Sequence, residues 1–90
     1  MRIMNKINFM PLPCKVCISR ENSEKIQKEL LINNFRWVNP SNKVLINVVC
    51  IFIYKDKTMR YGSHASALNA YELNFTIIDE YNFMKYLSII

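Results

Sequence analysis

The middle of the chain contains one unbroken apolar run, Val48-Val-Cys-Ile-Phe-Ile53. The run is far shorter than the ~20 residues that a membrane-spanning helix needs, so we expect no membrane span. Its β-branched side chains favour extended backbone, in which successive side chains point to opposite faces of a sheet. Because both faces of such a strand are apolar, both must be covered by other parts of the protein. The run therefore predicts a long central strand over residues 44–54.

Local patterns on both sides of this strand predict the other elements. Residues 14–19 alternate between apolar and polar side chains, as a half-buried strand does. A helix follows with Asn22 or Ser23 as its N-cap, and the pair Asn33-Asn34 can stop it in the left-handed conformation. Shorter strands are predicted at residues 35–38, 58–61 and 71–78, with a turn at 39–42, a hairpin tip at 55–57 and a last helix, capped by Asp79, at 80–87.

These elements predict one α+β domain in the order β-α-β-β-β-β-α. Ninety residues suffice for one compact domain and are too few for two. We expect an antiparallel sheet of four or five strands, one main helix packed on a face and a short C-terminal helix. Residues 1–13, with Pro11 and Pro13, are predicted to form an irregular N-terminal arm, and residues 14–90 the domain. Six residues are expected to be largely buried: Ile26, Leu30, Trp37, Val48, Ile51 and Phe75.

The net charge of +5 resides entirely in residues 1–45, because the basic and acidic residues of 46–90 cancel. A basic half favours encounter with a polyanion or with an acidic protein surface, although the same charge also serves solubility. Gly62 is the only glycine, so the chain has no glycine-rich phosphate loop.

The three cysteines and the single histidine, His64, make up the ligand set of a Cys₃His zinc site. However, Cys14 and Cys17 lie three residues apart on a predicted strand, which directs their sulfurs to opposite faces. We therefore expect the cysteines, including Cys50, to pack as small apolar side chains and to hold no metal. The first thirteen residues lack a secretory pattern, so we expect a cytoplasmic protein with free thiols rather than disulfides.

No catalytic set is apparent, and we predict neither catalysis nor a cofactor. The enzyme alternative rests on His64, which a small ribonuclease could use as a general acid or base, with Arg60 or Lys57 stabilising the phosphate. The string Gly62-Ser63-His64 resembles the signature of a toxin-type mRNA-cleaving family. That resemblance implies ribonuclease activity.

Aromatic and basic residues are interleaved in Phe35-Arg36-Trp37 and in Arg60-Tyr61. Aromatic rings beside arginine can bind single-stranded nucleic acid by stacking, but the same residue types also fill cores and anchor protein interfaces. A small basic nucleic-acid-binding module therefore remains an alternative.

A strand at 15–19 leads to a helix that ends in Asn-Asn-Phe-x-Trp37; a hairpin and Tyr61-Gly62 follow, and Phe75-Thr-Ile-Ile-Asp-Glu-Tyr-Asn-Phe83 enters the last helix. This layout resembles that of short accessory proteins of tailed bacteriophages, among which are anti-CRISPR and other anti-defence inhibitors. The resemblance implies a non-enzymatic inhibitor, monomer or homodimer, that acts in the host cytoplasm. Its partner would be a bacterial defence (CRISPR-Cas-like) or regulatory protein or nucleoprotein complex, with weak direct binding to nucleic acid as a further expectation. Six candidate contacts are predicted: Lys25, Lys28, Arg36, Lys43, Arg60 and Tyr61.

Overall fold

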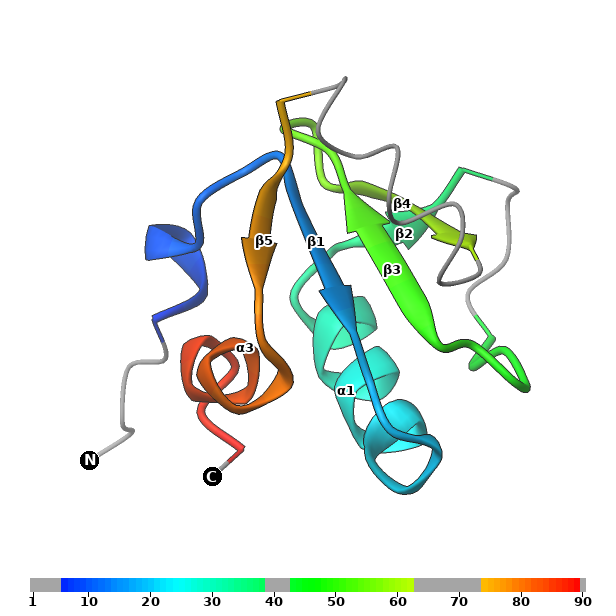
Figure 1. Cartoon of the computed structure of the whole chain (residues 1–90). Helices are drawn as coiled ribbons and strands as arrows, with labels where there is room; N and C mark the ends of the chain where they lie inside the picture. The colour runs from blue at the N-terminus through cyan, green and yellow to red at the C-terminus, as the bar shows by residue number, and fades with distance from the viewer. Residues whose placement is uncertain (1–5, 39–42, 63–73, 90) are drawn as a thin grey trace.

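The computed structural model describes residues 6–38, 43–62 and 74–89. These residues form a small compact α+β domain with a five-stranded sheet and two α-helices (Figure 1). The order of strands and α-helices is the predicted one. The elements are η1 (Ile7–Phe9), β1 (Cys14–Cys17), α1 (Arg20–Ile32), β2 (Arg36–Trp37), β3 (Cys50–Ile53), β4 (Thr58–Gly62), β5 (Thr76–Ile78) and α3 (Glu80–Tyr86).

The sheet is mixed, with the strand order β2-β4-β3-β1-β5. The central strand β3 pairs antiparallel with both β1 and β4, as predicted, whereas β1–β5 and β2–β4 are parallel. Only β3 and β4 are joined by a tight hairpin, which forces antiparallel pairing. Longer connections join the other strands, and such connections allow parallel pairing.

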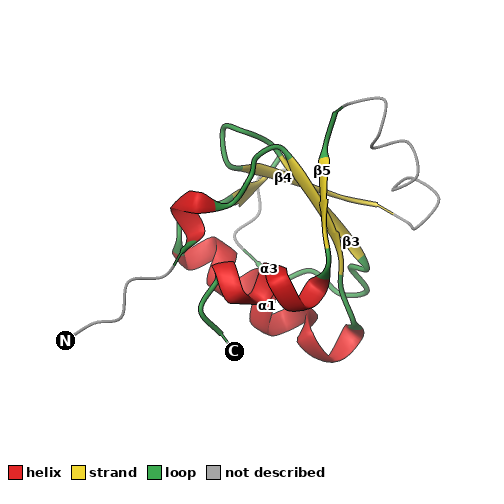
Figure 2. Cartoon of the chain, turned by 60° about the vertical axis from the view of Figure 1, so that its left-hand side comes forward, coloured by secondary structure: helices red, strands yellow, loops and turns green. Residues whose placement is uncertain are grey.

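Both helices pack on the same face of the sheet (Figure 2), which we call the helix face. Ile26 and Leu30 of α1, together with Phe83 of α3, meet strand residues such as Val16 and Ile51 in the main core. All six residues predicted to be largely buried are buried: Ile26, Leu30, Trp37, Val48, Ile51 and Phe75. We call the opposite side of the sheet the second face.

The predicted strand over residues 44–54 is wrong in its first half, because β3 begins only at Cys50. Asn47 has φ 62°, a left-handed conformation that no regular strand accepts. The buried side chain of Gln27 also forms two hydrogen bonds with the backbone of Leu45. Its Nε2 donates to the Leu45 carbonyl at 3.0 Å, and the Leu45 N–H donates to its Oε1 at 2.7 Å. A helix side chain thus takes the hydrogen bonds that a neighbouring strand would have made.

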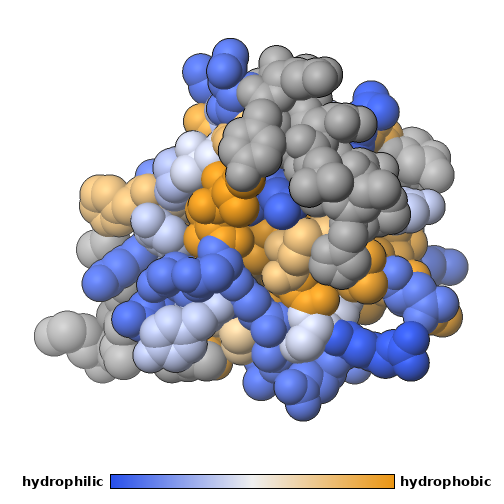
Figure 3. Space-filling model, in the orientation of Figure 1, coloured by the Kyte–Doolittle hydropathy of each residue, from blue (hydrophilic) through white to orange (hydrophobic). Residues whose placement is uncertain are grey.

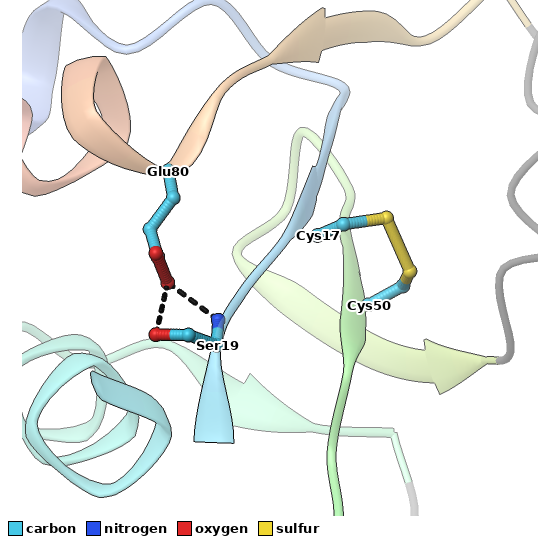
Figure 4. Close-up of a disulfide and its surroundings, with 4 residues drawn as sticks. All are labelled: Cys17, Ser19, Cys50 and Glu80. Atoms are coloured by element: carbon cyan, nitrogen blue, oxygen red, sulfur yellow. Dashed lines mark hydrogen bonds between the residues drawn. A yellow bond between two sulfur atoms is a disulfide. The ribbon is translucent and has the colours of Figure 1, made fainter. Parts of the chain in front are cut away.

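The first helix begins earlier than predicted, because Ser19 rather than Asn22 or Ser23 is its N-cap. Ser23 is buried and its Oγ donates instead to the Val48 carbonyl at 3.4 Å. The carboxylate of Glu80 accepts hydrogen bonds from the Ser19 N–H at 2.5 Å and from its Oγ at 2.9 Å (Figure 4). A residue at the start of α3 therefore stabilises the start of α1.

The other predicted helix ends are confirmed. Asn34 has φ 70° directly after α1, the left-handed stop that was expected. Asp79 caps α3 by accepting from the Asn82 N–H at 2.8 Å. In the N-terminal segment, Ile7 and Met10 are buried in the main core. The predicted turn at 39–42 and the first three residues of the strand predicted at 71–78 lie outside the described residues. The described part of that strand begins only at Thr76, because Asn74 has φ 58°, a left-handed conformation.

No helix among the described residues is both long and apolar enough to cross a membrane.

Candidate interaction surface

The strand register places three basic residues on the second face. Lys15 of β1 lies opposite Phe52 of β3, and Phe52 lies opposite Arg60 of β4. Arg36 of β2 is paired with Thr58, two residues before Arg60, and so shares its face because side chains alternate along a strand. Arg36 and Arg60 are exposed, and Lys15 is half-buried. We call these three residues the basic face.

An aromatic cluster lies beside the basic face, on the same side of the sheet. The ring of Phe75 meets Phe52 edge-to-face at a centroid distance of 5.7 Å and Tyr54 at 5.3 Å. Phe52 and Phe75 are buried, whereas Tyr54 remains half-buried. Figure 3 shows hydrophobic residues gathered at the middle of this side of the molecule, with hydrophilic residues around them. The second face thus combines apolar rings with positive charge.

Cys17 and Cys50 also lie on the second face, and a disulfide joins them (Figure 4). The prediction of free thiols is therefore wrong for two of the three cysteines. The two residues are direct partners in the β1–β3 register, and their Cα atoms are 4.1 Å apart, the close approach of a non-hydrogen-bonded antiparallel pair. Thirty-three positions separate them, so only the strand pairing brings them together.

Cys14 lies on the helix face, opposite the direction of Cys17, as its spacing predicted. Its side chain is fully buried, and desolvation raises the pKa of the thiol to about 12. The thiol therefore stays protonated at neutral pH and is a poor nucleophile or metal ligand. The described part of the chain contains no group of three metal-ligating side chains; His64 lies outside it.

The structure brings together three of the six predicted contacts and separates the other three. Arg36 and Arg60 share the second face on the neighbouring strands β2 and β4. Tyr61, which is 62% exposed, follows Arg60 on β4 and points to the helix face, where it packs beside Trp37. Lys25 and Lys28 are exposed on α1, across the sheet, and Lys28 Nζ pairs with Glu24 at 3.0 Å. The third outlier is Lys43, which is exposed in the segment that leads to β3.

Two features of this region had no sequence signal. Val38, directly after β2, is 43% exposed and continues the register beside Arg60. Trp37 packs edge-to-face against Tyr61 at 6.0 Å, and its buried indole N–H has no acceptor among the described residues. We call Arg36, Val38, Arg60 and Tyr61 the β2–β4 edge.

The hairpin that precedes β4 places a negative charge, Asp56, close to Arg36. Asp56 Oδ1 accepts from Thr58 Oγ1 at 2.6 Å and from the Thr58 N–H at 3.0 Å. These hydrogen bonds, with a smaller contribution from the charge of Arg36, lower the pKa of the Asp56 carboxyl. Asp56 is therefore ionised and already engaged at neutral pH.

A groove of about 600 Å³ lies elsewhere, between the first turns of α1 and residues 44–49. Ile46, at 87% exposure, is the most exposed of the large hydrophobic residues in the described part of the chain. The lining is apolar apart from Arg20, Ser23, Glu24 and Asn47.

Comparisons of the chain with protein-family models, with curated proteins and with solved structures gave no match.

Proposed function

We propose that this protein is a non-enzymatic inhibitor of the phage type, which acts by binding a bacterial defence or regulatory complex through its β2–β4 edge. The observation that carries the proposal is the exposure of Arg36, Val38 and Arg60 on the second face of two adjacent strands at one side of the sheet, with the exposed Tyr61 on the other face of the same strands. Tyrosine, tryptophan and arginine supply most of the binding energy in protein interfaces.

The charge of the edge favours an acidic partner surface. Arg36 and Arg60 project from the side that also carries Lys15, and none of these three forms a salt bridge with a described residue. Cations of this kind accelerate association and select partners more than they add affinity. The net charge of +5 argues against mimicry of a phosphate backbone, which requires a strongly acidic surface.

The test is an affinity capture from bacterial lysate after nuclease treatment, with matched variants. Tyr61→Ala and Val38→Asp should each reduce recovery of the captured complex at least tenfold, as expected for loss of interface anchors. Lys25→Glu, on α1, should leave recovery unchanged. Equal recovery with all variants would refute the edge as the docking site. Thermal unfolding of each variant shows whether the fold is intact.

The ribonuclease alternative has its own test. His64→Ala should have no effect on any cellular phenotype of the protein if it acts by binding. If that change abolished RNA cleavage in a protein that still folds, the non-enzymatic proposal would be overturned.

A further inference from the structure

We infer that the basic face binds the phosphate backbone of a single-stranded nucleic acid through Lys15, Arg36 and Arg60. This activity goes beyond the proposed docking of a protein at the β2–β4 edge, although the two surfaces share both arginines.

The charged side chains of the described strands on the second face have the same sign and lie close together. Among the described strand residues, every charged side chain on the second face is basic. Lys15 and Arg60 lie in one row across the sheet, separated by β3, and two strand spacings place their Cα atoms about 10 Å apart. Arg36 lies in the next row, on the edge strand. Three cations in a band of this size suit a polyanionic chain better than a single small anion.

Within the described part of the chain, no acidic side chain neutralises these cations by a salt bridge. Asp56 lies close enough to Arg36 for the two charges to interact, but its carboxylate accepts hydrogen bonds from Thr58. The guanidinium groups of both arginines therefore retain donors that match phosphate oxygens in a bidentate manner.

An aromatic side chain beside the cations favours a single-stranded nucleic acid over a duplex. Tyr54 packs its ring edge-to-face on Phe75 and is only half-buried, so part of this residue remains accessible beside the cations. Unpaired bases can stack on such a ring, and stacking contributes about 1–3 kcal/mol per base. A duplex keeps its bases stacked on one another and offers only its phosphates. An acidic protein segment offers carboxylates but no planar bases.

The test is fluorescence anisotropy with a labelled oligothymidylate single strand, with the oxidised full chain and no reductant. Three phosphate contacts on a single strand predict a slope of about −2 for log affinity against log salt concentration, so a fourfold increase in salt should weaken binding about 20-fold. Lys15→Glu combined with Arg60→Glu should weaken binding more than tenfold and reduce the slope to about −0.7, because one contact remains.

The matched control is Lys25→Glu combined with Lys28→Glu. It changes the net charge by the same amount, but on the helix that lies across the sheet. Binding within twofold of the original protein is expected. Equal losses in both double variants would show that net charge alone attracts the strand, and would overturn the inference. Absence of binding at low salt would also overturn it.

Two further probes decide the class of ligand. A duplex of the same length and polyglutamate should each bind at least fivefold more weakly than oligothymidylate. If polyglutamate binds as tightly, the face recognises acidic protein and the inference fails. Tyr61→Ala separates the two proposals, because it should reduce capture of the protein complex while leaving oligothymidylate binding unchanged.

Discussion

Removing the disulfide by Cys17→Ser combined with Cys50→Ser should destabilise the protein strongly without changing its fold. The cross-link closes a loop of 33 residues that contains α1, β2 and the segment leading to β3. In the chain-entropy description, opening a loop of this length adds roughly 12 cal/mol/K to the entropy of the unfolded chain, or about 4 kcal/mol of stability at room temperature. Strands β1 and β3 remain joined by their four-residue register, so we expect the native structure to persist.

Urea unfolding followed by the fluorescence of Trp37, the single tryptophan, measures this effect. With a slope of about 1 kcal/mol/M for a domain of this size, the midpoint should fall by roughly 3–4 M. A thiol reductant should lower the midpoint of the original protein to that of the variant and leave the variant unchanged. A loss below about 1 kcal/mol would refute the reasoning, because the cross-link would then not restrict the unfolded chain.

Three substitutions and one labelling experiment test the packing. Ile51→Asp should cost several kcal/mol, measured by urea unfolding, since Ile51 is fully buried and an unpaired charge would replace it. Gln27→Leu should cost about 2–4 kcal/mol in the same assay, because the N–H and carbonyl of Leu45 lose their partners; an unchanged midpoint would show that water replaces the amide. Asp79→Ala should cost about 1 kcal/mol through loss of the α3 N-cap and leave α1 intact by circular dichroism. Cys14 should resist iodoacetamide in the native, unreduced protein and react once per chain in urea, because burial raises its pKa to about 12; fast labelling of the folded protein would contradict its position.

Much of the fold could be predicted from local patterns, because the interactions that produce them are local. The alternation of Cys14, Val16 and Ile18 along β1 requires only one buried face, and all three side chains are buried. The capping of α3 by Asp79 and the stop of α1 at Asn34 depend on backbone geometry within a few residues. Similarly, the doubly apolar β3 had to be a central strand, and it is.

Other features depend on partners that are distant in the sequence. Ser19 begins α1 with the help of Glu80, 61 residues away, and Gln27 takes the backbone of Leu45 out of the predicted strand. An antiparallel sheet was predicted, but β2 and β5 pair in parallel with their neighbours, because long connections allow either direction.

For the candidate surface too, the residue types could be read from the sequence, but their relative positions could not. The residue types alone indicated Arg36, Arg60 and Tyr61 as contacts, through their charge and aromatic rings. Strand pairing in the folded domain puts Lys15 and the two arginines on one face and Tyr61 on the other. Lys25 and Lys28 lie across the sheet, on α1. Strand pairing also brings Cys17 to Cys50. The register of paired strands places residues that are far apart in the chain side by side. This register is set by the packing of the whole domain rather than by any one segment.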